Sequence, residues 1–291
     1  WGATLQTDDL ESHAAYVEAA LAEGRATVRQ DFEKRYKDRP DDPVWAFVQA
    51  YFLARDLPAQ RDAAAFETAA GKALAHLDRA DAGLPNAWPA SLLRGFVEHQ
   101  RWLRSGSPDA AANALNRYLL AIDLGRDNPR ALATLHFQAA LLQAGIGNDA
   151  SALRHLAARE RLPFASPEAE LSFRMLRAGC QFRQDRDREA DATADEARAL
   201  VDGNAALERY RPFVLDRAAE YALAAGNADK ALELYAKLRP LVAAATAPEA
   251  GVNRMKLEVA EGAAALAAGK SEAALKAFAA ARALLAGMPE G

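Results

Sequence analysis

Three ten-residue stretches align position for position: GNDASALRHL from Gly147, GNADKALELY from Gly226 and GKSEAALKAF from Gly269. Each starts with glycine, has Ala-Leu at its sixth and seventh places and ends on a large apolar residue. Recurrence of one pattern at a near-fixed interval is typical of proteins built from stacked structural repeats. These stretches therefore predict a repeat protein.

Weaker copies extend the array toward the N-terminus. GSPDAAANAL begins at Gly106 and DRDREADATA at Asp185, so the five starts are separated by 41, 38, 41 and 43 residues. A copy at Thr68, which we expect to lie inside a helix, keeps the small and large apolar residues. The copy at Gly24 is marginal, because charged residues take those places.

Each period predicts one helical hairpin. Glycine, or Asp in one copy, ends the first helix because it tolerates the left-handed backbone conformation that closes the last turn. In the second helix the small sixth residue, such as Ala152, lets the neighbouring backbone come close. The large residue four places on, such as Leu156, lies on the same face one turn along. We expect this pair to form the internal contact of each hairpin.

Prolines mark where the first helices begin. Asp, Asn or Ser stands before proline in DDPVWAFV, DNPRALATL and ASPEAELSF, as at helix N-termini. The prolines in such positions are Pro43, Pro89, Pro129, Pro167 and Pro248. We place the first helices at about residues 43–55, 87–104, 129–145, 167–183, 206–225 and 248–268. Alternating β-branched runs do not occur in the sequence, so the predicted fold class is all-α.

The pattern resembles the tetratricopeptide repeat family, in which small and large residues flank a glycine-containing turn at fixed places. In the copy ending at Leu241 those places hold Ala219, Ala222, Gly226, Ala231, Tyr235 and Leu238, and in the last copy they hold Gly262, Ala265, Gly269, Ala274, Phe278 and Ala281. The first-helix half departs from the family, because alanine replaces the usual aromatic residue and only Trp102 keeps it. The period is also longer than the family's 34 residues.

The resemblance implies an α-solenoid of stacked antiparallel helical hairpins with a period of about 41 residues. Residues 85–291 are expected to form the tetratricopeptide-like repeats, and residues 1–84 divergent N-terminal hairpins. No Gly/Ser-rich or Pro-rich linker divides the sequence, so we expect one continuous solenoid of about six or seven hairpins.

Composition and charge narrow the range of partners. A net charge of −4 and a pI near 5.8 argue against nucleic acid, since binding to phosphates needs a dense array of Lys and Arg. No apolar run is long enough for a membrane-spanning helix. The chain begins with Trp1 and not Met, which indicates that an N-terminal piece is missing, either a signal or anchor or a trimmed segment. Cytoplasm and periplasm both stay open as localisations.

The sequence offers no motif for catalysis, cofactors or metals. Cys180 stands alone in an apolar run and is expected to be a buried core residue. The histidines show no metal-like pairing in sequence, and Walker, dinucleotide and nucleophile-elbow glycine motifs do not occur. The carboxylates of Glu220, Glu258 and Glu261 are expected to be exposed and not to act as catalytic acids or bases. We therefore expect a non-enzymatic protein without a cofactor or metal.

The resemblance also implies a concave groove lined by the first helices. The family's Lys and Asn pairs that clamp a peptide carboxylate are missing, and an apolar middle predicts binding of an apolar or amphipathic segment of a partner protein. The predicted groove residues are Phe96, Gln100, Phe137, Leu141, Met175, Phe213, Asp216 and Glu220. The alternative is that these residues belong to the core, because longer helices rotate the register.

Three functions therefore stay open. The first is a non-catalytic interaction scaffold, which the fold resemblance favours. The second is an enzyme or small-ligand-binding protein with a pocket where His99, His136 and either Gln100 or Arg177 converge. The third is a self-associating component of a bacterial assembly or secretion complex, since the Ala and Arg bias is typical of GC-rich genomes. Its contact would be the C-terminal helix 271–286, with Leu275, Phe278 and Leu285 exposed.

Overall fold

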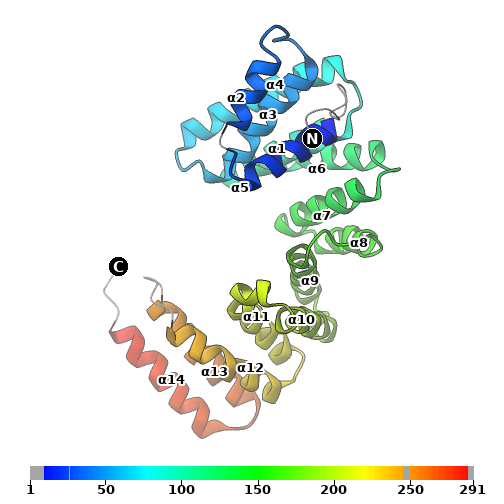
Figure 1. The fold of residues 1–291 in the computed structure, drawn as a ribbon. Coiled ribbons are helices and arrows are strands. Elements are labelled where there is room, and N and C mark those ends of the chain that lie inside the picture. Colours follow the sequence, from blue (N-terminus) through cyan, green and yellow to red (C-terminus); the bar gives the residue numbers. More distant parts are fainter. Residues whose placement is uncertain (1–9, 26, 245–249, 288–291) are drawn as a thin grey trace. The chain divides into compact units, whose positions relative to one another are not determined.

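The computed structural model describes residues 10–25, 27–244 and 250–287. This part of the chain folds into fourteen α-helices and two short 3-10 helices and contains no strand (Figure 1). The all-α fold class predicted from the sequence is thus confirmed. The helices belong to two compact units, residues 1–163 and 164–291.

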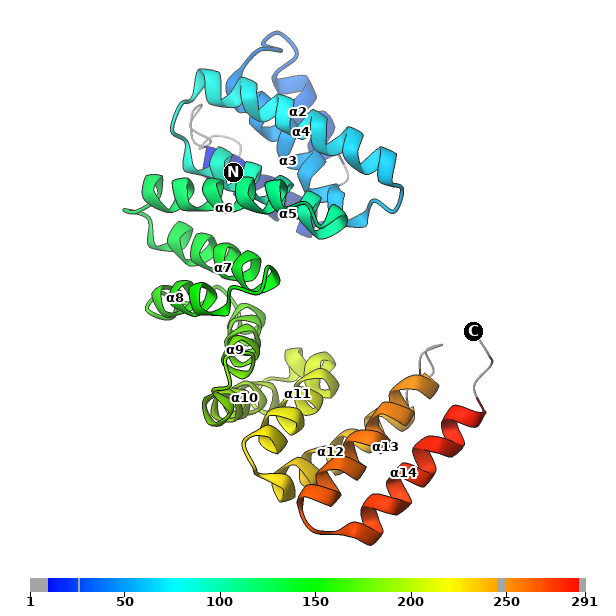
Figure 2. The same ribbon diagram turned by 180° about the vertical axis from the view of Figure 1, so that it is seen from behind.

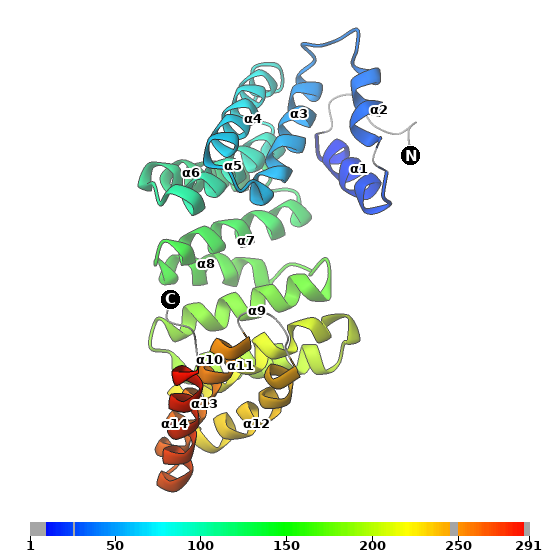
Figure 3. The same cartoon turned by 90° about the vertical axis from the view of Figure 1, so that its left-hand side faces the viewer.

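The first unit consists of two leading helices and three antiparallel hairpins. The leading helices are α1 (Leu10–Ala22) and α2 (Val28–Arg35). The hairpins are α3 (Pro43–Asp56) with α4 (Ala63–Gly83), α5 (Trp88–Ser105) with α6 (Pro108–Leu124), and α7 (Pro129–Gly145) with α8 (Asp149–Glu160). The 3-10 helix η1 (Leu57–Ala59) follows α3. Successive helices from α3 to α8 pack against each other, and Figure 3 shows α5 to α8 as layers of one stack.

The second unit contains three more hairpins. They are α9 (Pro167–Phe182) with α10 (Asp187–Asp202), α11 (Arg211–Ala224) with α12 (Ala228–Ala244), and α13 (Ala250–Ala267) with α14 (Ser271–Ala286). The 3-10 helix η2 (Ala205–Tyr210) leads into α11. Each helix from α9 to α14 packs against the next, and Figure 2 shows α12, α13 and α14 side by side. Each unit is thus a stack of antiparallel α-hairpins, as the repeat pattern predicts.

The turn residues adopt the left-handed conformation that the sequence pattern predicts. Five glycines have φ between 69° and 84°, namely Gly24, Gly106, Gly147, Gly226 and Gly269. A Cβ at any of the five would meet no atom within 4 Å, so backbone conformation and not crowding explains why glycine stands there. Asp185 takes the same role with φ 56°, because Asp is one of the few other residues that tolerate this region.

The caps before proline form as expected. The side chain of Asp42 accepts a hydrogen bond from Val44 N, and Asn128 and Ser166 accept from backbone N–H groups in the first turns of α7 and α9. The helices α3, α7 and α9 begin at the predicted prolines. Pro248 lies outside the described residues, and α13 is described from Ala250.

Glycine and alanine let the two helices of a hairpin approach closely. Ala152 and Leu156 are 0% and 1% exposed, which confirms the predicted pair in the second helix. In two hairpins the first helix has a glycine where the aromatic side chain of the second helix packs. A Cβ on Gly95 would lie 2.7 Å from the ring of Tyr118, and one on Gly262 would lie 2.6 Å from the ring of Phe278. Both distances are too short for any residue but glycine, so each aromatic ring packs directly on the backbone of its partner helix.

One helix differs from the prediction. Residues 206–225 were expected to form a single helix, but the 3-10 helix η2 precedes α11. Pro212 explains the break, because it has no N–H to donate to the carbonyl of Glu208 and its ring would clash there. Thr68 lies inside α4, as expected, and because α4 begins at Ala63 the buried pair Ala73 and Leu77 comes later in its helix than in the other hairpins.

The division into domains at residue 84 and the single continuous solenoid stay predictions. Leu84 lies within the first compact unit, directly after α4. None of the helices in the described ranges combines the length and the hydropathy that a bilayer-spanning segment requires.

Candidate functional site

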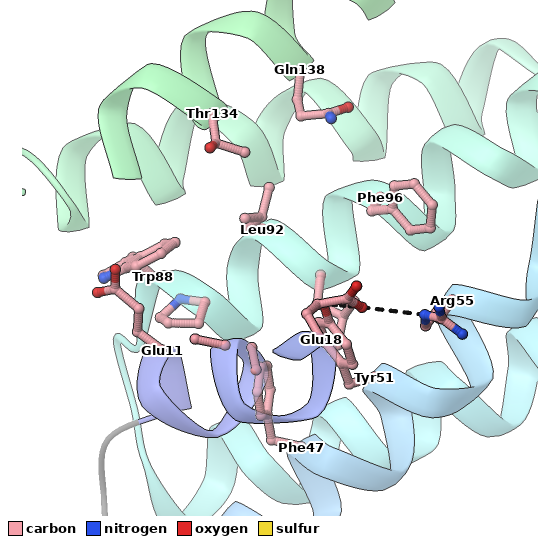
Figure 4. A pocket seen from close by; sticks show the side chains of 14 residues that line it. Glu11, Glu18, Phe47, Tyr51, Arg55, Trp88, Leu92, Phe96, Thr134 and Gln138 are labelled. Carbon is pink, nitrogen blue, oxygen red and sulfur yellow. Dashed lines mark hydrogen bonds and ion pairs between the residues drawn. The ribbon is translucent and has the colours of Figure 1, made fainter. Parts of the chain in front are cut away.

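The first unit contains an apolar cavity of about 460 Å³ between α1 and the first helices of its three hairpins, α3, α5 and α7. We call it the N-terminal slot (Figure 4). It is lined by Glu11, Ala14, Ala15 and Glu18 of α1, Phe47, Tyr51 and Arg55 of α3, Trp88, Pro89, Leu92, Leu93 and Phe96 of α5, and Thr134 and Gln138 of α7. The first helices of three successive hairpins therefore share one surface, as a repeat groove requires.

Helix α1 forms one wall of this slot because it has two different faces. Leu10, His13, Val17 and Ala20 recur every three or four residues and are buried in the core of the unit. Ala14, beside the buried stripe, and Ala15, opposite it, line the slot with small side chains that leave it open. Helix α1 is therefore anchored by one face and lines the slot with the other.

Hydrogen bonds and an ion pair fix α1 to the first helices at both ends of the slot. Asn128, the N-cap of α7, donates from Nδ2 to Glu11 Oε2 at 2.8 Å. Tyr51 Oη donates to Glu18 Oε1 at 2.9 Å, and Arg55 Nε lies 3.2 Å from the same oxygen, as Figure 4 shows. Burial, and then the bond to Glu18, raise the pKa of Tyr51, so its hydroxyl stays a donor. The polar groups at the ends of the slot are thus paired, and its middle is apolar.

The second unit contains a slot of different chemistry, of about 550 Å³, between α11 and α13 with α12 as its floor. We call it the C-terminal slot. It is lined by Pro212, Phe213, Asp216, Arg217, Glu220 and Leu223 of α11, Tyr235, Leu238 and Val242 of α12, and Asn253, Lys256, Leu257 and Ala260 of α13. Phe213 is 53% exposed at its edge. Charged side chains here alternate with apolar ones, unlike in the N-terminal slot.

The structure places the predicted groove residues in three groups. Phe96 lines the N-terminal slot and packs against the core of that unit. Phe213, Asp216 and Glu220 come together along one wall of the C-terminal slot. The remaining four line neither slot and are partly buried, and they are Gln100, Phe137, Leu141 and Met175. Met175 packs against the core of the second unit, which is the alternative that the sequence left open.

Sequence reasoning did not assign α1 to the groove. No repeat pattern covers residues 10–22, and the wall that they form depends on how the chain folds back onto α3 and α5 and reaches the start of α7 through Glu11 and Asn128. The spacing of Leu10, His13 and Val17 was the available signal, because it marks one buried face of a helix. It does not say which surface that face covers.

The two histidines of the pocket considered above each contact a residue of their own hairpin. His99 Nδ1 bonds Tyr118 Oη at 3.2 Å, and His136 Nδ1 lies 3.1 Å from His155 Nδ1 across the α7–α8 hairpin. A hydrogen bond between two Nδ1 atoms requires one protonated and one unprotonated nitrogen. Burial lowers the pKa of both His136 and His155, and for His155 the neighbouring His136 and Arg154 lower it further.

This pair makes stability depend on pH. Both folded-state pKa values lie below the ordinary 6.5, so the unfolded chain takes up protons first as pH falls. The stabilisation is present above pH 6.5 and is lost as pH falls below it. Between about pH 7.5 and pH 5.5 we expect the wild type to lose more unfolding free energy than His155→Gln does, measured by urea denaturation. Equal losses in the two proteins would contradict this assignment.

The other candidate reactive groups from the sequence are buried or paired with neighbouring side chains. Cys180 is buried, as expected. Glu258 and Glu261 were expected to be exposed, but their side chains are only 14% and 16% exposed because both pair with Arg239. Across the described residues no group of three or more His, Cys, Asp or Glu side chains is placed to hold a metal ion.

Solved structures with the same arrangement of helices are tetratricopeptide repeat proteins. YrrB, described as a tetratricopeptide repeat protein with an unusual peptide-binding site, aligns with a TM-score of 0.51 at 18% identity over 71% of this chain and 90% of its own. PilW, a type IV pilus biogenesis factor, aligns with a TM-score of 0.56 at 14% identity over 84% of this chain and 94% of its own.

A third solved structure is a signal transduction ATPase of Pyrococcus horikoshii with a tetratricopeptide repeat sensor. It aligns with a TM-score of 0.57 at 13% identity over 95% of this chain, which spans 48% of that protein. No family model and no curated protein matches the chain. The chain therefore has the fold of tetratricopeptide repeat proteins, as the sequence resemblance implies.

Proposed function

We propose that this protein is a non-catalytic docking scaffold that binds an apolar or amphipathic helical segment of a partner protein in the N-terminal slot. The observation that carries this proposal is the slot itself: one apolar cavity shared by the first helices of three successive hairpins, with its charged groups paired at the ends. The peptide-binding site named for the structurally similar YrrB supports the same class of function.

The chemistry of the slot favours a helical segment. Its apolar walls, from Phe47 on α3 to Trp88 and Phe96 on α5, match the i, i+3, i+4 and i+7 anchors of an amphipathic helix. Ala14 and Ala15 let a second helix come close to α1, as small residues do within the hairpins. Thr134 and Gln138 offer hydrogen bonds at the polar edge of such a helix.

A substitution in α1 tests this proposal without disturbing the core. Ala15 is exposed and lines the slot, so Ala15→Glu adds a charged side chain at the place where the partner helix would pack. Helical peptides selected from a displayed library against the wild type are expected to bind Ala15→Glu about tenfold more weakly, by isothermal titration calorimetry. Ala112→Glu is the matched control, since Ala112 is exposed on α6 and lies outside the slot.

Two results would contradict the proposal. Either no library peptide binds the wild type, or the selected peptides bind Ala15→Glu and Ala112→Glu equally well. Because both variants add the same charge to an exposed helical alanine, a difference between them reports the slot and not the net charge.

Small apolar molecules are a second candidate ligand. The volume of the slot, about 460 Å³, lies in the range of small-molecule sites, and its lining is mostly apolar with a few polar groups. If the slot serves a small molecule, a fluorescent apolar dye is expected to bind in it, and Ala15→Glu is expected to weaken that binding as it would weaken peptide binding. The helical peptides would then not displace the dye. Competition by the peptides would favour the docking scaffold.

Self-association through α14 stays a prediction. Leu275 is 72% exposed, Leu285 59% and Phe278 37%, so the apolar face predicted for this helix is present. Light scattering after size-exclusion chromatography tests it: a dimer that dissociates on Leu275→Glu supports the contact. A monomer at high concentration would overturn it.

A further inference from the structure

The side chains that line the two walls of the C-terminal slot carry net charges of opposite sign. On α11, Arg217 Nη1 lies 2.5 Å from Glu220 Oε2, whereas its Nη2 stays 3.6 Å from Asp216 Oδ2. Arg217 therefore pairs closely with Glu220, and it offsets the negative charge of Asp216 less than that of Glu220. The side chain of Asp216 is 48% exposed, so it leaves a negative pole on this wall.

The opposite wall is positive. Lys256 of α13 is exposed and lines the slot, and within the described ranges it takes part in no hydrogen bond or ion pair. Asn253 lies one turn before it on the same helix and also lines the slot. Two lysines of the second unit differ from Lys256, because Lys230 pairs with Asp191 and Asp195, and Lys270 pairs with Asp229. The ammonium group of Lys256 is thus available to an acidic group of a ligand.

The middle of the slot between these poles is apolar. Leu238 and Tyr235 form the floor, and Phe213 stands 53% exposed at the edge. Burial, followed by the charges of Asp216 and Glu220, raises the pKa of Tyr235 to about 12. The negative potential of the α11 wall therefore extends to the floor. The lining residues of α11, from Pro212 to Leu223, span about 16 Å, which is about three helical turns.

We propose that the C-terminal slot is a second docking site, which binds an amphipathic helix carrying a basic residue on the flank facing Asp216 and an acidic residue on the flank facing Lys256. The apolar stripe of such a helix covers Phe213 and the floor, and its two flanks complement the two walls. Like charges on both flanks would place one of them against a wall of the same sign. This inference shares with the proposed function the idea of a docking scaffold, but it concerns a different slot.

Three peptides of about fourteen residues test the proposed charge pattern of the bound helix. All share one leucine stripe on an alanine-rich helix, and their flanks are one acidic and one basic, both acidic, or both basic. Fluorescence anisotropy against the Ala15→Glu protein, in which the N-terminal slot is blocked, is expected to show about tenfold tighter binding of the mixed peptide than of either other peptide. Phe213→Ala is expected to weaken binding of the mixed peptide at least fivefold, which would locate that peptide at the C-terminal slot.

Charge reversals in the protein are expected to switch the preference. Asp216→Lys makes both walls positive and should favour the peptide with two acidic flanks, whereas Lys256→Glu makes both walls negative and should favour the peptide with two basic flanks. Lys237→Glu is the matched control, because Lys237 is exposed on α12 and does not line the slot. It should leave the order of affinities unchanged.

The outcomes separate the two proposals. Equal affinity for the three peptides, with binding still weakened by Phe213→Ala, overturns the proposed charge pattern. Docking at this slot would then still be supported. Binding that ignores Phe213→Ala, or no binding of any peptide, overturns the second site. Neither result bears on the N-terminal slot, which the comparison of Ala15→Glu with Ala112→Glu decides separately.

Discussion

Tyr118→Ala is expected to lower the unfolding free energy by about 3–5 kcal/mol, the range for removing a large buried aromatic side chain. Tyr118 is 0% exposed and packs on the backbone of α5 at Gly95, so its loss leaves a cavity at the centre of the α5–α6 hairpin. It also removes the partner of His99 Nδ1, which is itself buried. Urea denaturation followed by circular dichroism measures the change.

Two neighbouring variants separate the causes. Tyr118→Phe keeps the ring and loses only the hydroxyl, so we expect a loss of about 1 kcal/mol. Leu119→Ala alters the next residue, which is 44% exposed, and is expected to cost less than about 1 kcal/mol. If Tyr118→Ala costs no more than Leu119→Ala, the hairpin is not held by the contact between its aromatic residue and glycine.

Asp191→Ala is expected to lower the unfolding free energy by about 2 kcal/mol. Asp191 is 6% exposed and connects two successive hairpins of the second unit. Its Oδ1 lies 2.6 Å from Lys230 Nζ, and its Oδ2 accepts from Asn227 Nδ2 at 2.8 Å. Burial lowers the pKa of Lys230, but the bonds to Asp191 and Asp195 outweigh it and raise the pKa above its ordinary value.

Asp195 provides the control in the same network. Its Oδ2 also lies 2.6 Å from Lys230 Nζ, but its side chain is 39% exposed and so contributes less. Asp195→Ala is expected to cost below about 1 kcal/mol in the same urea titration. Equal costs for the two variants would show that burial of Asp191 does not set its contribution.

Local conformational requirements explain why the hairpins could be predicted from the sequence. The left-handed turn at Gly226, or at Asp185, depends on a single residue, and the caps at Asp42 and Asn128 depend on neighbours in sequence. Such features recur in several copies and therefore appear as a pattern. The break before α11 was missed because a pattern of apolar residues does not register the N–H that Pro212 lacks.

The sites were less accessible to the same reasoning. The C-terminal slot lies within consecutive repeats, so Phe213, Asp216 and Glu220 could be placed on one surface from the register alone. The N-terminal slot depends on α1, which carries no repeat and folds back across three hairpins. The contact between His136 and His155 crosses a hairpin turn, so spacing in the sequence does not reveal it.

Nuclear magnetic resonance of the tryptophan indole N–H groups tests the docking scaffold most directly. Trp88 lines the N-terminal slot, whereas Trp45 is 7% exposed within the core and Trp102 lies outside the slot. A bound helical peptide is expected to shift the Trp88 signal and to leave those of Trp45 and Trp102 in place. A peptide that binds without moving the Trp88 signal would contradict docking in this slot.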